Sequence, residues 1–446
     1  MEKEYLIREK PLKALLLFAF PMIIGNLFQQ FYTMVDSVVV GRFVSENALA
    51  AVGASYSLTN VFISIAIGGG VGASVLVSRY FGARDYRRMK TSVSTALISF
   101  LVVSLALGGL GLLLGDQIME VLNTPENIME DAVTYLNIYF MGLPFLFMYN
   151  VLSAMFNALG KSRIPLYLLI FSSVFNVVLD LIMVCSFHMG VAGVAWATLI
   201  AQGISAVMAF LIFIREMRSY QSGEEIRWFD RREFGSMCRI ALPSILQQST
   251  VSIGMMLVQS VVNSFGAQML AGYSAGMRIE SICIVPMAAM GNVMSSFTAQ
   301  NLGAKQQERV VKGYHTAYGI VFGFGILICV ILEIFYRPLI LMFLGEEGTA
   351  LALNTGMSYM RFIGFFFSFI GLKMITDGLL RGAGDMKMFT VANLVNLGIR
   401  VAVAVIMAPR FGIAFVWYAV PMGWLANYLI SFARYKTGIW KSTGRG

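Results

Sequence analysis

The chain has 446 residues, of which 58% are hydrophobic and only 13% are charged. A water-soluble protein of this length needs more charge to cover its surface, so the composition excludes an ordinary soluble enzyme or regulator. The formal net charge of +9 would suit a nucleic-acid-binding protein, but the basic residues fall in alternate loops between apolar segments, so no nucleic-acid partner is expected.

Apolar segments long enough to cross about 30 Å of hydrocarbon recur along the whole chain. Turn and charge signals divide them into twelve predicted helices, which makes the predicted fold class an all-α polytopic membrane protein. In chain order, the predicted transmembrane helices span residues 12–41, 47–81, 91–115, 129–157, 164–186, 191–214, 238–265, 268–302, 314–336, 350–380, 388–408 and 412–433.

Lys and Arg residues are concentrated on one side of this arrangement. Of the 33, 26 lie in the termini or in the loops that follow every second predicted helix, and only three lie in loops on the opposite side. The positive-inside rule therefore predicts cytoplasmic termini. We expect a multi-pass protein of the cell (plasma) membrane.

The two halves of the chain resemble each other. FGARD at 81–85 recurs as LGAKQ at 302–306, and at the same offset of 221 residues ENALAAVGAS matches AQMLAGYSAG. Both halves contain six predicted helices and begin on the same side, so the repeat is parallel. We predict two pseudo-symmetric six-helix lobes around a central cleft, with an N-lobe at 1–216, a cytoplasmic linker at 217–234 and a C-lobe at 235–446.

The first predicted helix carries a carboxylate inside a membrane span. Asp36 continues a stripe of polar residues three or four positions apart, namely Asn26, Gln29 and Thr33, with Tyr32 one turn before Asp36. Such a stripe is expected to line a cavity rather than to contact lipid. We predict Asp36 as an ion-coupling residue that binds H⁺ or Na⁺, and the others as cleft-lining residues. A structural Asp hydrogen-bonded between helices is the alternative.

The fifth predicted helix places a second carboxylate in the same lobe. Asp180 lies one turn after Asn176, so the two side chains share a helix face. Ion coupling through Asp180, with Asn176 lining the substrate site, is one interpretation. A structural hydrogen bond between helices is the other.

The seventh predicted helix carries a second polar stripe, formed by Gln247, Gln248, Ser252, Gln259 and Asn263. Uncharged polar residues in membrane helices often hold helices together. They are also suited to line the C-lobe side of the cleft, which is the interpretation we favour.

The eighth and tenth predicted helices carry charges of a different kind. Arg278 and Glu280 are two residues apart and cannot face each other on a helix, so each needs another partner. Both a buried structural ion pair and a place in the cleft remain open for them. Asp377 lies one turn from Lys373 and from Arg381, so local pairing is expected there.

No residue pattern indicates a bound cofactor, a resident metal or an enzyme. The four cysteines, Cys185, Cys238, Cys283 and Cys329, are far apart, and no cluster of His, Cys or paired acids resembles a catalytic site. The glycine-rich stretch at 68–74 lacks the Lys of a phosphate-binding loop, and no nucleotide-binding domain is present. An ion gradient is therefore the expected energy source, not ATP.

Several segments, in this order, resemble those of the MATE (multidrug and toxic compound extrusion) family, in particular its Firmicute-type multidrug exporters. The resemblance covers nearly the whole chain. The segments are NLFQQFYTMVDSVVVGRF, ALAAVGAS, VLVSRYFGARD, NALGKSRIPL, FNVVLD, QNLGAK and LRGAGD.

The resemblance implies an antiporter in which H⁺ or Na⁺ enters the cell as an organic, usually cationic, compound leaves. The family's first-helix Asp matches Asp36, and the Asp of the fifth helix matches Asp180. Sodium-type members place a Glu in the seventh helix and an Asp in the tenth. This chain has Gln247 and Gln248 in the seventh helix, and Asp377 lies closer to the end of the tenth. This departure favours H⁺ over Na⁺ and coupling through the N-lobe.

The expected function is the export of organic, cationic drugs or toxic compounds by a monomer whose partners are its small-molecule substrate and the bilayer. A flippase of lipid-linked precursors, from the same superfamily, is the first alternative. It would need cationic residues along the cavity to hold a pyrophosphate. A passive channel is the second alternative, and it would conduct without coupling.

Overall fold

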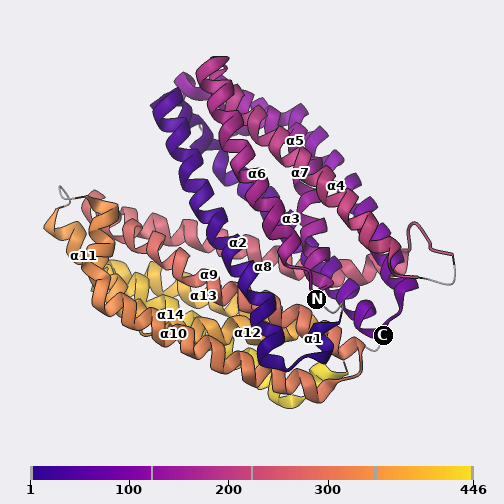
Figure 1. Cartoon of the computed structure of the whole chain (residues 1–446). Helices are drawn as coiled ribbons and strands as arrows, with labels where there is room; N and C mark the ends of the chain where they lie inside the picture. The colour runs from indigo at the N-terminus through magenta and orange to yellow at the C-terminus, as the bar shows by residue number, and fades with distance from the viewer. Residues whose placement is uncertain (1–3, 122–123, 222–224, 346–348, 443–446) are drawn as a thin grey trace. The chain divides into compact units, whose positions relative to one another are not determined.

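The computed structural model describes residues 4–121, 124–221, 225–345 and 349–442. Every regular element in these ranges is a helix (Figure 1). In chain order they are α1 (Tyr5–Arg8), α2 (Pro11–Val39), η1 (Val40–Val44), α3 (Glu46–Ala83), α4 (Tyr86–Val121), α5 (Glu126–Ala158), α6 (Arg163–Leu181), η2 (Ile182–Ser186), α7 (Gly190–Arg218), α8 (Arg231–Asn263), α9 (Ala267–Gly303), α10 (Gln307–Leu344), α11 (Ala350–Gly364), α12 (Phe367–Ala383), α13 (Met386–Phe411), α14 (Ala414–Thr437) and η3 (Ile439–Lys441).

The predicted all-α membrane fold is confirmed. Among the described residues, ten spans are long and apolar enough to cross a membrane, and the bent pair α11 and α12 gives an eleventh. Helix α14, with 24 residues, occupies the predicted twelfth span. The structure therefore agrees closely with twelve transmembrane helices.

One predicted helix, 350–380, is wrong as a single element. The chain bends by 54° between α11 and α12. At the break the exposed Phe365 is followed two residues later by Phe367, which is fully buried. The turn lets one ring of this aromatic run enter the core while its neighbour points outward, and no proline marks the position.

The chain folds as two compact units. One is Ile24–Ile245, and the other joins the described residues of Met1–Ile23 to those of Leu246–Gly446. Both boundaries fall inside long helices, so α2 and α8 each contribute one part to each unit. The sequence analysis instead expected the N-lobe to end at 216 and the C-lobe to begin at 235, between helices, and these lobe limits remain a prediction.

In the unit Ile24–Ile245, helix α5 packs against α3, α4 and α7 (Figure 1). The buried rings of Phe140 and Phe147 fill its core. Close approach is possible because α4 has glycine at the contact: a Cβ on Gly108 would lie 2.8 Å from the Phe140 carbonyl oxygen. Small residues allow such packing in membrane helices, where the hydrophobic effect does not drive helices together.

In the other unit, helix α9 packs against α10, α11 and α12. The backbones of α9 and α12 nearly touch, because a Cβ on Gly378 would overlap the carbonyl group of Gly291. This approach draws the neighbouring residue Asp377 deep into the unit, where it is 3% exposed.

The backbone supports the sequence repeat. Arg84 and Lys305, which correspond in the two halves, both adopt the left-handed conformation with φ of 57° and 59°. Gly160 and Gly384 also correspond, with φ of 76° and 81°. Non-glycine residues rarely adopt positive φ, so its recurrence at matched positions reflects a common local structure.

Candidate functional site

The two acids predicted as ion-coupling residues lie together in the unit Ile24–Ile245. Asp36 comes from α2, and Asp180 comes from the last turn of α6, where it is fully buried. Their carboxyl groups lie close enough to each other to share a hydrogen bond. Two residues 144 positions apart in the chain are thus joined into one acidic pair.

An asparagine amide links this pair to α7. In the orientation that satisfies both of its amide atoms, Asn176 Nδ2 donates to Asp180 Oδ2 at 3.1 Å, and its Oδ1 accepts from the backbone N–H of Thr198 at 3.1 Å. The same amide is 2.5 Å from the hydroxyl oxygen of Tyr32. Asn176 and Asp180 share a face because they are one turn apart on α6, as do Tyr32 and Asp36 on α2.

The acidic pair lacks a counter-charge. Oδ1 of Asp36 and Oδ1 of Asp180 are both buried and receive no hydrogen bond from an ordinary donor of the described residues. Neither carboxyl group joins an ion pair there. A hydrogen bond between two carboxyl groups requires a proton on one of them, and two adjacent charges without a cation are costly away from water. The pair can therefore hold a proton between its oxygens, or a small cation in its place.

The backbone is irregular next to both acids. The π-helical segment η1 begins four residues after Asp36, and η2 begins two residues after Asp180. Valines of both segments, Val40 and Val184, belong to one buried apolar cluster that also contains Ala48, Val191 and Val194. This cluster covers the chain just beyond the acids, and π-turns of this kind are frequent at functional sites.

Sequence reasoning missed both π-segments and one aromatic residue. Tyr135 of α5 lies close enough to Asp36 and Asp180 to interact electrostatically with both. A tyrosine in a transmembrane helix one turn from another tyrosine, here Tyr139, was the available signal. Periodicity has no comparable signal for a π-turn.

The remaining residues of the first polar stripe lie on the exposed surface of α2. Asn26, Gln29 and Thr33 are exposed, and the Thr33 hydroxyl donates to the Gln29 carbonyl at 2.9 Å. Polar side chains exposed inside a membrane span need water or a ligand. Their predicted role as lining residues stays a prediction.

The polar stripe of α8 divides into two groups. Gln247 Nε2 donates to Asn393 Oδ1 at 3.3 Å and so enters a buried network. The Gln248 carbonyl accepts from the Ser252 hydroxyl at 3.2 Å, and Gln259 donates to Asn263 at 3.1 Å. The five residues therefore have different surroundings, and their shared role as a cleft wall remains a prediction.

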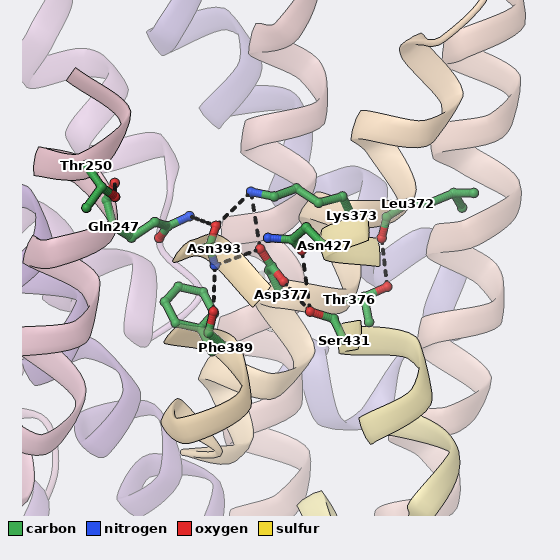
Figure 2. Close-up of polar contacts among 10 residues, drawn as sticks. All are labelled: Gln247, Thr250, Leu372, Lys373, Thr376, Asp377, Phe389, Asn393, Asn427 and Ser431. Carbon is green, nitrogen blue, oxygen red and sulfur yellow. Dashed lines mark hydrogen bonds and ion pairs between the residues drawn. The ribbon is translucent and has the colours of Figure 1, made fainter. Parts of the chain in front are cut away.

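Lys373 and Asp377 form the centre of that buried network (Figure 2). Their ion pair spans 3.2 Å and is almost inaccessible. Asn393 accepts from Lys373 Nζ at 3.1 Å and donates to Asp377 Oδ2 at 3.2 Å, while Ser431 donates to Asp377 Oδ1 at 2.7 Å. The expected local pairing is confirmed, and it joins residues of α8, α12, α13 and α14 into one neutral assembly (Figure 2).

Comparison with known proteins settles the family. The MatE family model matches residues 21–182 and 243–406. The chain belongs to the MATE family.

Individual relatives agree with this assignment. A probable multidrug resistance protein of Bacillus subtilis, YpnP, is 29% identical over 433 residues, which are 97% of this chain and 96% of that protein. The multidrug export protein MepA of Staphylococcus haemolyticus is 24% identical over 267 residues, 60% of this chain and 59% of that protein. These relatives fit the resemblance to Firmicute-type members.

Solved structures of the family share the fold. An outward-facing conformation of a multidrug resistance MATE family transporter of the MOP superfamily matches with a TM-score of 0.89 at 23% identity. The match covers 100% of this chain and 99% of that one. A MATE crystal structure in a bent conformation matches with a TM-score of 0.90, also at 23% identity.

Glu280 of this MATE transporter is buried but not bonded to Arg278. Its Oε2 accepts from the Tyr359 hydroxyl, and the Tyr359 ring lies 5.3 Å from that of Tyr273. Arg278 is exposed on the other side of α9. The argument that these two charges cannot face each other is thus confirmed, and their place in the cleft remains a prediction.

A flippase would need cations free to hold a pyrophosphate, but two cations of the predicted membrane spans are already engaged. Lys373 is neutralised by Asp377, and Arg361 pairs with Glu333 at 3.4 Å. Among the described residues, no group of three or more His, Cys, Asp and Glu side chains is arranged to hold a metal ion. The acidic pair is therefore the candidate site whose charge is least compensated by neighbouring groups.

Proposed function

We propose that this MATE transporter is an ion-coupled antiporter that exports organic, cationic compounds from the cytoplasm, with Asp36 and Asp180 as its coupling residues. The observation that carries the proposal is the acidic pair itself. Asp180 and the Oδ1 atom of Asp36 are buried, the pair lacks a cation among the described residues, and the two carboxyl groups are in contact. The similarity to a probable multidrug resistance protein and to a multidrug export protein supports the substrate class.

H⁺ is the preferred coupling ion. A bond between the two carboxyl groups needs one shared proton, so the geometry suits a site that exchanges protons. Na⁺ remains the alternative, with carboxylate oxygens of Asp36 and Asp180 as ligands. No cofactor and no ATP take part.

The proposed cycle follows from what the proton does to the pair. Proton uptake from outside removes a negative charge and weakens the attraction for a cationic substrate, which is released outward. Proton loss to the cytoplasm restores that charge and the affinity for the next substrate. Because the bond joins α2 to α6, a change in it alters how α2 is held, and the missing N–H of Pro21 makes a bend of α2 easier there.

The polar surface of α2 supplies the proposed substrate path. Asn26, Gln29 and Thr33 provide exposed polar atoms, and Tyr32 with Asn176 lies beside the acids. We place Gln247, Gln248, Ser252, Gln259, Arg278 and Glu280 on the C-lobe side as a second, weaker part of the proposal. We also propose that the protein is a monomer of the plasma membrane with cytoplasmic termini, and that its lobes are residues 1–216 and 235–446.

The test is ethidium transport by the full-length protein in proteoliposomes under an imposed pH gradient, and separately under a Na⁺ gradient. Asp36→Asn removes the charge that attracts the cation and the group that takes up the proton, so it is expected to lower gradient-driven transport by at least tenfold and to weaken ethidium binding. Ser37→Ala is the matched control, because Ser37 is the next residue and its hydroxyl donates to the Thr33 carbonyl of the same helix at 2.9 Å. Full gradient-driven transport by Asp36→Asn would overturn the mechanism, and flux that ignores both gradients would indicate a channel.

A further inference from the structure

We propose that the segment Arg227–Arg232, here called the linker anchor, binds anionic phospholipid headgroups at the membrane surface through Trp228 and its flanking arginines. The anchor follows α7 and includes the first two residues of α8, in the compact unit Ile24–Ile245. It is distinct from the acidic pair and takes no part in the proposed ion coupling.

The backbone on both sides of Trp228 is fixed to α4. The Ser94 hydroxyl donates to the Arg227 carbonyl at 3.1 Å, and the Asp230 N–H donates to the Thr95 hydroxyl at 3.0 Å. Trp228 itself is 80% exposed. A large apolar ring held out from a docked backbone is costly in water, so its position indicates a contact with something apolar at one end and polar at the other.

The position along α4 indicates which surface that is. Ser94 is on the same helix face as Ile98, Leu101, Val102 and Leu105, because they follow it at intervals of 4, 7, 8 and 11 residues. All four are exposed and apolar, which marks the lipid-facing side of α4. The linker anchor therefore sits where this stripe begins, at the level of the headgroups, where Trp side chains are enriched.

Phe229, the residue after Trp228, packs its ring 5.9 Å from that of Phe234 in the first turn of α8. Both phenylalanine rings remain partly exposed, and Trp228 is the most exposed of the three rings. The contact between Phe229 and Phe234 holds the segment against the start of α8.

The charges around Trp228 select an anionic lipid. Arg231 and Arg232 are exposed and form no ion pair with other described residues. Arg227 contacts Asp230 at 3.4 Å but keeps 72% of its side chain exposed. Arginine donates to phosphate oxygens in a paired geometry, and basic residues at the membrane surface attract anionic lipids.

The anchor is rigidly continuous with the transporter. Glu233, one residue beyond it, accepts from the Tyr80 hydroxyl at 2.8 Å and from the Ser92 hydroxyl at 2.6 Å. These bonds join the start of α8 to α3 and α4. A lipid bound at Trp228 therefore contacts a segment that is fixed to three helices.

The experiment uses the purified full-length protein in nanodiscs that contain dansyl-labelled phosphatidylglycerol or dansyl-labelled phosphatidylcholine. The signal is energy transfer from tryptophan to the dansyl group. The share due to Trp228 is the transfer in the wild type minus the transfer in Trp228→Phe, a variant that keeps an aromatic ring at this exposed position. We expect transfer to be larger for phosphatidylglycerol. One basic residue at the surface contributes about 1 kcal/mol, so Arg231→Gln with Arg232→Gln should lower this preference by at least about fivefold.

The matched control is Arg337→Gln with Arg410→Gln. These two arginines are exposed, in the C-terminal parts of α10 and α13. The control removes the same charge and should leave the transfer from Trp228 unchanged. Equal transfer to both lipids in the wild type would overturn the selection of anionic lipid. Absence of any Trp228-dependent transfer would overturn the anchor altogether, and neither result depends on whether the protein transports ethidium.

Discussion

The two buried polar networks of this transporter differ in what they leave unsatisfied. Asp377 has a lysine at 3.2 Å, an asparagine and a serine, which together neutralise and fill its oxygens. Asp36 and Asp180 have each other, and each keeps one buried oxygen without an ordinary donor. Both networks cost desolvation energy, but only the second has the uncompensated acids that we propose take up an ion.

The difference teaches that a carboxylate inside a membrane span is not by itself a coupling site. A neutral ion pair with further hydrogen bonds, such as Lys373 with Asp377, crosslinks helices and has no charge left to balance. An acidic pair without a counter-charge needs a mobile ion to balance it. Substitutions in the two networks should accordingly affect stability in one and transport in the other.

The largest expected effect is on stability, from Lys373→Met. It leaves Asp377 buried and ionised without a cation, which typically costs about 3–5 kcal/mol. Adding Asp377→Asn restores a neutral network of the same shape and should recover all but about 1–2 kcal/mol. Thermal unfolding of the purified protein measures both variants.

Lys387→Met is the control for the lost positive charge. It replaces an exposed lysine at the start of α13 and should leave the unfolding temperature unchanged. If Lys373→Met unfolds like the wild type but no longer transports, the buried pair is a functional site and the comparison fails.

A smaller effect is expected on transport, from Asp180→Asn. The new amide can still donate to Asp36, so the pair keeps its contact but loses one carboxyl group that exchanges protons. We expect initial gradient-driven rates about tenfold lower, equivalent to about 1.4 kcal/mol, and less affected than in Asp36→Asn. Ser172→Ala, which removes a weak bond from the same helix α6 to Ala201 at 3.4 Å, is the control and should transport normally.

The sequence was sufficient to predict the helices and the two acids, for one physical reason. A bilayer requires long apolar segments, so hydropathy locates them, and any ionisable residue inside them stands out. Asp36 and Asp180 were found in this way. The same rule located Asp377 and, from the spacing of Lys373, its partner.

What the sequence could not supply is which helix faces meet. The contact between Asp36 and Asp180 depends on how α2 packs against α6, and helical periodicity assigns a residue to a face without saying what covers it. For the same reason the polar stripe of α8 was predicted as one surface, although Gln247 is bonded to Asn393 and Gln259 is not.

Glu280 is intermediate between the neutralised Asp377 and the uncompensated acidic pair. It is buried and has one hydroxyl donor, but it forms no ion pair with another described residue. Glu280→Gln keeps an acceptor for Tyr359 and removes the charge, so we expect transport within about twofold of the wild type. Tyr359→Phe instead leaves the carboxylate without that donor and should lower stability by about 1–3 kcal/mol. Transport assays and thermal unfolding separate the two. A tenfold loss of transport in Glu280→Gln would make it a third coupling residue.

The smallest effect is expected outside the membrane, at Asp230, whose carboxylate caps α8 by accepting from the N–H groups of Arg232 at 2.8 Å and Glu233 at 3.3 Å. These two N–H groups lower the pKa of Asp230. A lowered pKa means that its contribution to stability is present above the unfolded value of about 4 and is lost as the pH falls through the folded value.

Asp230→Ala should therefore cost about 1 kcal/mol near pH 7, and the difference from the wild type should shrink toward pH 3. Asp230→Asn, which also caps helices well, should lose little at either pH. Thermal unfolding across this pH range tests the contrast with the acidic pair. A carboxylate with donors from its own helix stays ionised and structural, whereas Asp36 and Asp180 lack such donors for one oxygen each and so depend on an ion.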